Sequence, residues 1–362
     1  KICLNSQISA LCLYNQRGIY STSSKERIKE LDTYFDENNI TDPIDKMLMT
    51  TNYIDNYGFL SGLEISDICE ELDIFRFGSY YDIIGMEELR IDSVGKVYWC
   101  SNDYPGIGVS PSVVCKKVTI HNICLERPSR WVSSNQKFGR YMFRESAVEE
   151  VDISLCESSK TWAETNWNIL KTLYTSGTTN ATLGYSNDAS PFYEAFYYAG
   201  AIKRINLNNI TKIFPSMFSY TIFYNAATAD DYISELEEIV TDEPITSIGI
   251  RAFYYAQVKT RNASELFTRG TGSVVDIQEV AFRESNMYMT DFSSCVFIGN
   301  YAFYRDTFPE NEDGEVILDL PVIESIGSYA FNNTNLTKVR VKAGCTYGSY
   351  AFPEDCLVLE TY

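Results

Sequence analysis

The clearest pattern in the chain is an apolar hexapeptide, Ile326–Phe331, whose variants recur through the second half of the sequence. In the shortest units, successive terminal Phe residues are 21 or 22 residues apart (352−331 = 21, 218−196 = 22), and insertions lengthen the others to as many as 35 (253−218 = 35). A fixed period near 21 predicts stacked repeats, each of which buries its apolar face only against its neighbours. Close copies end at Phe253, Phe303 and Phe352, the copy ending at Phe282 lacks only the Gly, and looser copies end at Phe143, Phe196 and Phe218.

Each position of the hexapeptide has an expected physical role. The Ile belongs to a short strand and points inward, while the Gly lets the backbone approach a neighbouring unit where a Cβ would collide. The Ala is small enough to lie beneath the next unit, and the Phe rings are expected to stack on one another. Apolar residues also follow the Phe at offsets of 5, 8 and 10 in two distant units: Leu336, Val339 and Val341 after Phe331, and Val148, Val151 and Ile153 after Phe143.

The repeat predicts one long array over residues 61–362, degenerate over 61–190 and regular over 190–362. In the degenerate part, alternating segments such as Leu63–Ile65 predict half-buried strands, and 101–106 and 175–180 read as projecting loops. Residues 1–60 do not fit the repeat. They predict a strand over 8–14 and a helix over about 23–35, which begins at the capping box of Ser23 and Glu26. Their default role is an N-terminal cap, and a separate attachment segment is the alternative.

Two insertions in the regular part also carry predictions. Ile233, Leu236 and Val240 have helical spacing, so a helix is expected over 232–240. The acidic segment 309–315 resembles a calcium loop, but its acidic residues lack the alternate spacing of an EF-hand. A solvated turn is therefore expected there.

Composition and charge limit the partners. The 362 residues carry 49 Asp plus Glu against 30 Lys plus Arg, a net charge of −19, so nucleic acids and anionic membrane surfaces would be repelled. No apolar run approaches 18 residues, which predicts no membrane insertion, and a start at Lys1 rather than Met predicts a processed product or a fragment. None of the ten Cys form a C-x-x-C pair, so mostly reduced, structural thiols are expected. Cys345 and Cys356 would bridge only with Cα atoms within about 7 Å.

The sequence offers little for catalysis. His121 is the only His and lies on the polar phase of a predicted strand, so a multi-His metal site is excluded and a surface role is expected. No P-loop occurs, and Gly106–Gly108 lacks the third Gly of a dinucleotide site. We therefore expect no enzyme, no metal site and no cofactor.

One column of residues suggests a binding surface. The residue two places before the terminal Phe is Tyr141, Tyr301, Tyr329 or Tyr350 in four units, so stacking would align these rings on one face. Tyr suits binding because it combines contact area with a hydroxyl and few rotamers. The alternative is that these rings only stack on one another and stiffen the array.

The unit I-G-x-x-A-F followed by L-x-x-V-x-V resembles the BspA-type leucine-rich repeat, found in surface proteins of gut and oral bacteria and in families of parasitic protists. The resemblance implies a right-handed solenoid with short β-strands in every coil, and a role in adhesion or protein binding. The expected function is a non-enzymatic adhesion scaffold, extracellular or at the cell surface, which recognises a protein or glycan on a host or neighbouring surface through a solenoid face or its loops. The alternative is a structural or receptor-reading component of a larger assembly, such as a phage virion or surface layer.

Overall fold

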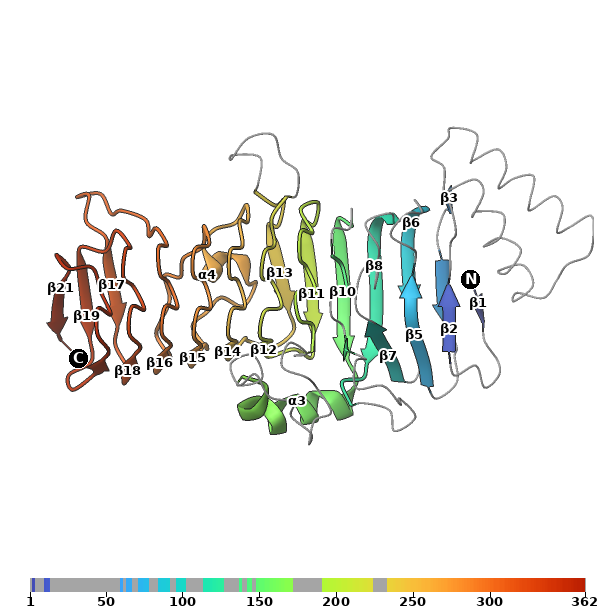
Figure 1. Ribbon diagram of the computed structural model, residues 1–362, viewed down its shortest axis with the longest axis horizontal. Coiled ribbons are helices and arrows are strands. Elements are labelled where there is room, and N and C mark those ends of the chain that lie inside the picture. The colour runs from blue at the N-terminus through green and yellow to red at the C-terminus, as the bar shows by residue number, and fades with distance from the viewer. Residues whose placement is uncertain are drawn as a thin grey trace, which may run out of the picture.

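The computed structural model shows an elongated stack of β-strands that runs from the N-terminal strands to β21 (Figure 1). It describes residues 2–3, 10–13, 59–60, 63–66, 71–77, 84–91, 96–101, 113–126, 137–138, 142–144, 148–171, 191–223 and 233–361. Among these, every strand pairs in parallel with its neighbours except β7 with β9. Parallel pairing of strands contributed by successive units is what a stack of sequence repeats produces.

The largest sheet spans the N-terminal two thirds of the stack and follows the order β1-β4-β6-β8-β10-β11-β13, with β2, β3, β5, β7 and β9 paired alongside. The segments predicted as half-buried strands are observed as strands of this sheet. Its strands are β1 (Ile2–Cys3), β2 (Ala10–Leu13), β3 (Phe59–Leu60), β4 (Leu63–Ser66), β5 (Glu71–Phe77), β6 (Ile84–Ile91), β7 (Lys96–Ser101), β8 (Val113–Ile123), β9 (Lys137–Phe138), β10 (Glu150–Leu155), β11 (Arg204–Asn208) and β13 (Glu238–Thr241).

Two smaller parallel sheets complete the C-terminal part of the stack. One contains the two-residue strands that hold the Ile of each repeat, in the order β12-β14-β15-β16-β18-β20, and the other has the order β17-β19-β21. Their strands are β12 (Lys212–Ile213), β14 (Ser247–Ile248), β15 (Asp276–Ile277), β16 (Phe297–Ile298), β17 (Ile317–Leu320), β18 (Ser325–Ile326), β19 (Lys338–Val341), β20 (Thr346–Tyr347) and β21 (Leu357–Glu360).

The terminal Phe residues form one continuous column through the core. Neighbouring rings are stacked with centroids 4.8 to 5.8 Å apart and interplanar angles of 3° to 16°. This confirms the predicted stack, and it extends the array back to the unit of Phe143, whose N–H donates to the Ala195 carbonyl at 2.7 Å. The column is Phe143, Phe196, Phe218, Phe253, Phe282, Phe303, Phe331 and Phe352.

The repeat Gly residues allow the close approach between units that the sequence predicted. A Cβ built on Gly327 would lie 2.4 Å from the backbone nitrogen of Asn300 in the preceding unit, and one on Gly299 would lie 2.4 Å from that of Glu279. Contacts this short are forbidden between non-bonded atoms, so a side chain at Gly299 or Gly327 would force the backbones of the two units to shift. In the copy that has Gln278 in place of the Gly, the backbone still bonds to the preceding unit: the Gln278 N–H donates to the Ile248 carbonyl at 2.9 Å.

In the turn that carries each Phe, successive backbone N–H groups donate alternately to the following unit and to their own unit. In the unit of Phe303, three N–H groups donate to carbonyl groups of the following unit at 2.8 to 3.2 Å: Tyr301 to Ser328, Phe303 to Ala330 and Arg305 to Asn332. The intervening Tyr304 and Asp306 donate back within their own unit. The alternation depends on left-handed backbone, which costs a non-Gly residue about 1–2 kcal/mol and is stabilised here by the bonds between units. Left-handed φ recurs two places before the Phe, at 194, 216, 251, 280, 301, 329 and 350, and two places after it, at 198, 220, 255, 284, 305 and 333.

The predicted helix over 232–240 is wrong within the described residues. Glu238–Thr241 is the strand β13, and Ser234 forms a parallel bridge with Val258. Leu236 and Ile239 are buried whereas Ile233 is 42% exposed, so burial does not follow the helical period. The backbone of this segment is therefore set by its pairing with the neighbouring units, which outweighs the helical spacing of its apolar residues.

The long helix of the described chain lies elsewhere, at α3 (Glu157–Leu170), and runs along one edge of the stack (Figure 1). It belongs to the insertion between Phe143 and Phe196. Its buried residues Ser159, Ala163, Trp167 and Leu170 recur at helical spacing and form the face turned to the core. A single helical turn, α4 (Ala263–Leu266), is capped by the Asn262 side chain, which accepts from the Ser264 N–H at 3.0 Å.

In the N-terminal segment, the strand predicted over 8–14 is observed as β2, while the helix predicted over 23–35 lies outside the described residues. β1 pairs with β4 and β2 pairs with β5, both in parallel. These two strands therefore continue the large sheet. The loops predicted over 101–106 and 175–180 lie, apart from Ser101, outside the described residues.

Candidate binding surface

The tyrosines of the predicted column lie side by side. The Tyr301 and Tyr329 rings stack with centroids 4.9 Å apart and planes 2° apart, and Tyr329 stacks on Tyr350 at 5.2 Å. All three occupy the left-handed position two places before the Phe. Tyr350 is 68% exposed at the end of the stack, whereas Tyr301 and Tyr329 are half-buried. Tyr141 lies outside the described residues.

The structure adds tyrosines that the sequence column did not include, because they lie one or two places after the Phe instead of two places before it. The Tyr220 and Tyr255 rings stack with centroids 5.3 Å apart and planes 1° apart, and Tyr220 also contacts Tyr197 and Tyr254. We call the whole set the aromatic edge: Tyr197, Tyr198, Tyr220, Tyr254, Tyr255, Tyr301, Tyr304, Tyr329 and Tyr350. A search for Tyr two places before, one place after or two places after each Phe would have found the whole aromatic edge.

The Arg283 side chain connects Tyr255 of the aromatic edge with Tyr301 and Tyr304. The Arg283 guanidinium lies over the rings of Tyr301 and Tyr304, at 5.5 and 5.2 Å from their centroids. It also forms an ion pair with Glu284 at 3.0 Å, and Glu284 accepts a hydrogen bond from the Tyr255 hydroxyl. That bond to Glu284 raises the pKa of Tyr255, and burial raises the pKa of Tyr220 to about 12, so both hydroxyls are protonated donors at neutral pH. Tyr and Arg side chains held in this way are typical of protein interfaces.

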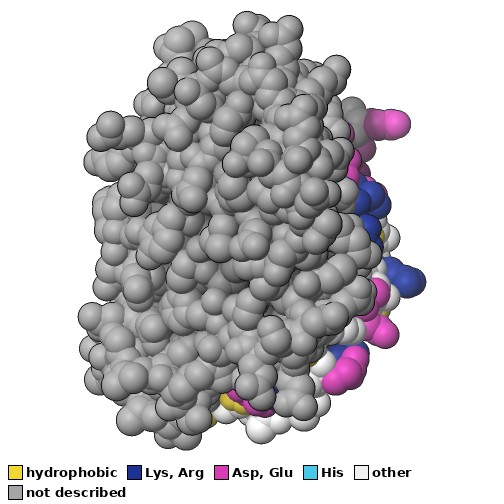
Figure 2. Space-filling view, turned by 90° about the vertical axis from the view of Figure 1, so that its right-hand side faces the viewer, with side chains coloured by type: hydrophobic (Ala, Val, Ile, Leu, Met, Phe, Trp, Pro, Cys, Tyr) yellow, Lys and Arg dark blue, Asp and Glu magenta, His cyan; other side chains and the backbone are white. Residues whose placement is uncertain are grey.

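Charged side chains on the large sheet are arranged by the strand register. Lys117, Glu150, Arg204 and Glu238 are consecutive partners across four neighbouring strands, so their charges alternate in sign. The Arg204–Glu238 pair is an ion pair at 2.8 Å. Seen from the N-terminal end, Lys and Arg side chains likewise alternate with Asp and Glu along the described side of the surface (Figure 2). Opposite charges in neighbouring strands stabilise this register, because a slip would bring like charges together.

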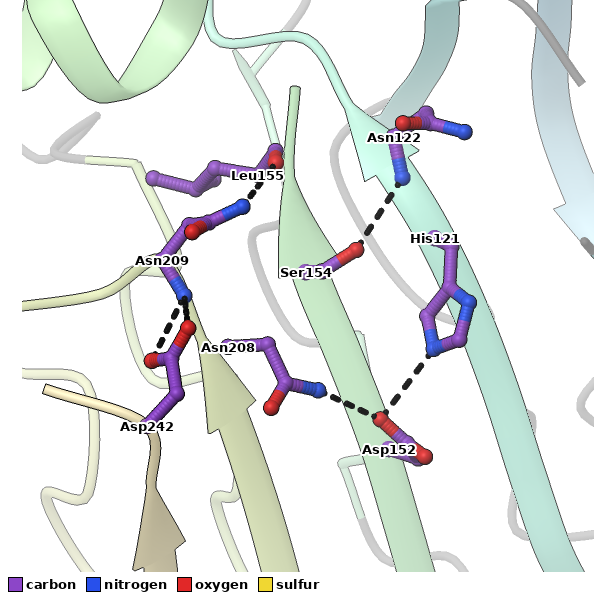
Figure 3. Close-up of polar contacts among 8 residues, drawn as sticks. All are labelled: His121, Asn122, Asp152, Ser154, Leu155, Asn208, Asn209 and Asp242. Atoms are coloured by element: carbon purple, nitrogen blue, oxygen red, sulfur yellow. Dashed lines mark hydrogen bonds and ion pairs between the residues drawn. The ribbon is translucent and has the colours of Figure 1, made fainter. Parts of the chain in front are cut away.

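The single His is part of a polar cluster on the same sheet (Figure 3). The His121 Nε2 lies 3.2 Å from Asp152 Oδ1, and the Asn208 side-chain amide donates to the same oxygen at 2.9 Å. The hydrogen bond with His121 is the main cause that lowers the pKa of Asp152. The Ser154 hydroxyl accepts from the Asn122 N–H at 3.3 Å, so it is engaged with the backbone of the neighbouring strand. These bonds join β8, β10 and β11 and support the surface role expected for His121.

Asp306 is a buried carboxyl three places after its Phe, a position at which Thr221, Ser285 and Thr334 carry a hydroxyl. Its Oδ1 accepts from the Ser285 N–H at 3.1 Å, whereas its Oδ2 has no hydrogen-bond partner among the described residues. Burial raises its pKa well above the ordinary value. The equivalent Thr221 and Thr334 donate to the carbonyl of their own Phe, at 2.9 and 2.7 Å. Asp306 thus places a carboxyl where these two units place an uncharged hydroxyl donor.

The acidic segment 309–315 is a turn, as predicted. The Asn311 side-chain oxygen accepts from the N–H groups of Asp313 and Glu315 at 3.0 and 2.9 Å. Gly314 adopts a φ of 73°, and residues 309–314 are exposed. Within the part of the chain that the structure describes, no three His, Cys, Asp or Glu side chains are placed to hold a metal ion.

The fold and the surface together define a β-rich, parallel-stranded repeat protein that presents Tyr and Arg side chains along one edge. The family model described as BspA type Leucine rich repeat region matches residues 186–270 and 230–360, with six copies. Residues 186–360 are therefore a BspA-type leucine-rich repeat region, which confirms the resemblance seen in the sequence. No curated protein and no solved structure matches the chain.

The family indicates a repeat-based scaffold for protein interaction or adhesion. The described helices include none with the length and apolar content needed to cross a membrane.

Proposed function

We propose that the units wind as one right-handed solenoid, capped or attached through residues 1–60. In this proposal the chain is a non-enzymatic adhesion scaffold, extracellular or at the cell surface, which binds a protein through the aromatic edge. The observation that carries it is the recurrence of outward Tyr or Arg side chains at the same turn of seven units, from Tyr197 to Tyr350. A core requires only the inward Ile, Ala and Phe of each turn, so packing alone does not explain this composition.

The packing of the rings favours a protein over a glycan. A sugar ring stacks on a free aromatic face, but the faces of Tyr301 and Tyr329 already cover each other. The ring edges, the hydroxyl groups and the neighbouring guanidinium of Arg283 remain outward, and these suit the peptide groups and side chains of a protein. Twenty-eight residues separate Tyr301 from Tyr329 in sequence, so only the stacking of units brings them together.

The test separates binding from stability. In the variant with both Tyr301→Phe and Tyr329→Phe, the rings still stack but both hydroxyls are lost. It should melt like the parent protein and bind its protein partner about tenfold more weakly, because each lost hydrogen bond at an interface is worth about 0.5–1.5 kcal/mol. Partners would be sought on arrays of cell-surface proteins and of glycans, and affinities measured by surface plasmon resonance. Tyr288→Phe, outside the aromatic edge, is the matched control.

Two results would contradict the proposal. Unchanged affinity of the double Phe variant for every protein that the parent binds would limit these tyrosines to stiffening the stack. Binding of the parent to glycans alone would exclude a protein partner for this surface.

A role as a subunit of a larger assembly, such as a virion or a surface layer, is the second candidate. It is favoured by the apolar side chains that the last unit exposes, with Tyr347 and Leu357 each 52% exposed. An assembly subunit should self-associate in light scattering, and Leu357→Lys should abolish the association. An adhesin should remain monomeric at the same concentration.

A further inference from the structure

The register of the large sheet brings two cysteines together at the point where α3 begins. Leu155 of β10 pairs with Ile123 of β8, so the residues that follow them, Cys156 and Cys124, are neighbours across the two strands. The Cys156 N–H donates to the Ile123 carbonyl at 3.0 Å, and the Cys124 thiol hydrogen-bonds the Cys156 sulfur. Paired strands lie about 4.8 Å apart, which is within the Cα separation of about 4.4–6.8 Å that a disulfide spans. Neither sulfur is part of a disulfide in the structure.

The surroundings of Cys156 stabilise a thiolate. Cys156 is the N-cap residue of α3, a helix of 14 residues, so its sulfur lies at the positive end of the helix dipole. Its sulfur lies 3.4 Å from the Ser158 hydroxyl and 3.3 Å from the Ser159 hydroxyl. Ser159 is fully buried, and its oxygen accepts from the Leu125 N–H at 2.7 Å and from the Cys156 thiol at 3.3 Å. When the sulfur is a thiolate, the Ser159 hydroxyl becomes the donor. The bond with Cys124 and these two hydroxyls, against the effect of burial, lower the pKa of Cys156 to about 4.

Cys295, Cys345 and Cys356 lack this environment, and burial raises the pKa of each of them. Burial alone raises the pKa of Cys356 to about 11, although Cys356 is half-buried like Cys156. Cys295 is fully buried, and burial raises its pKa to about 12. The low value at Cys156 therefore follows from its hydrogen bonds, the one with Cys124 first, since partial burial alone acts in the opposite direction.

We propose that Cys124 and Cys156 are a redox-active pair that closes to a disulfide by exchange with a small disulfide of the glutathione type, with Cys156 as the attacking thiolate and Cys124 as the resolving thiol. The partly exposed Cys156 sulfur attacks one sulfur of the small disulfide, forms a mixed disulfide and releases one thiolate, which takes the proton of the Cys124 thiol. The Cys124 sulfur then attacks Cys156, and the second small thiolate leaves. The protein loses two electrons, and the small disulfide is reduced to one thiol and one thiolate, which takes its proton from solvent.

The test uses the full chain and oxidised glutathione. Peptide mapping by mass spectrometry should find Cys124 linked to Cys156, and the oxidised protein should melt at a higher temperature than the reduced one, because the bond restricts the unfolded chain. In Cys124→Ser the glutathione adduct at Cys156 should persist. In Cys156→Ser, Cys124 should remain reduced because it is fully buried. Circular dichroism would verify that both variants fold.

A second measurement needs no variant and uses Cys356 as an internal control. The two cysteines would be compared by alkylation with limiting iodoacetamide at neutral pH. The larger thiolate fraction of Cys156 favours its alkylation over that of Cys356 by about four powers of ten, and the lower nucleophilicity of a low-pKa thiolate reduces this advantage by about three powers of ten. Cys156 should therefore be alkylated roughly tenfold faster. Equal or slower labelling of Cys156, a stable mixed disulfide in the parent protein, or pairing of Cys156 with a cysteine other than Cys124 would each overturn the proposal.

Discussion

Replacing one ring of the Phe column measures how much of the stability resides in the contact between units. Phe303 is fully buried and stacks on Phe282 at 4.9 Å and on Phe331 at 5.2 Å. The edges of its ring also meet Phe292 and Phe308, at centroid distances of 5.9 and 5.7 Å. Phe303→Ala therefore removes four aromatic contacts at once.

The expected cost is at the upper end of the range for such a change. Burial and cavity effects of Phe→Ala are worth about 3–5 kcal/mol, and each stacked pair adds about 0.5–1.5 kcal/mol beyond burial. The space cannot close readily, because the Phe282 N–H is bonded to the Ala302 carbonyl at 2.7 Å and the Phe303 N–H to the Ala330 carbonyl at 2.8 Å. We expect a loss of about 5 kcal/mol in the free energy of unfolding.

The matched control is Phe352→Ala at the end of the column. Phe352 is 8% exposed and stacks on one ring, Phe331, at 5.8 Å. Its removal should cost about 2–3 kcal/mol, near or below the low end of the range. Urea denaturation followed by circular dichroism and by hydrogen exchange would measure both. Equal losses for Phe303→Ala and Phe352→Ala would refute the argument that stacking on both faces sets the magnitude.

Three further substitutions probe single positions. The pKa of Asp306 is raised on folding, so its contribution to stability is complete below about pH 4, the ordinary value for Asp, and is lost as the pH rises through the folded value. Asp306→Asn should therefore raise the free energy of unfolding by about 1–3 kcal/mol at neutral pH, with no gain at about pH 4. Thermal melts across this range would check it, and a variant no more stable than the parent at neutral pH would contradict it. Gly327→Ala should lower the free energy of unfolding by about 3 kcal/mol through overpacking. Gly314→Ala, whose added Cβ meets no atom within 4 Å but whose φ is 73°, should lower it by about 1 kcal/mol. The reverse order in urea denaturation would contradict the close approach at Gly327.

The scaffold could be predicted from the sequence because each unit repeats the same inward residues. The Ile, Gly, Ala and Phe of Ile326–Phe331 have one physical role in each copy that contains them, and the structure places them accordingly. The failure at 232–240 has a physical cause as well. Ile233, Leu236 and Val240 satisfy a helical period, but hydrogen bonds to neighbouring units, such as the Glu235 N–H to the Gly200 carbonyl at 2.9 Å, favour an extended backbone.

The candidate site was only partly predictable. Tyr301, Tyr329 and Tyr350 share one offset from the Phe, so the sequence aligned them correctly as a stacked column. The Tyr220–Tyr255 pair lies at another offset, and its relation to the first group appears only when the turn is folded and all of these positions face outward. Cys124 and Cys156 are 32 residues apart, and only the register of β8 and β10 makes them neighbours.

The alternating hydrogen bonds of the Phe-bearing turn also bear on how the protein would respond to mechanical load. The bonds between units in this turn, such as that from Phe303 to Ala330, connect one unit to the next along the stack. Tension applied between the two ends would therefore separate units in succession instead of shearing all their bonds at once. We expect the array to lengthen by one unit at a time at low force and to re-form when the load is released. A tether with this property dissipates work while its remaining units keep their Tyr and Arg side chains in place.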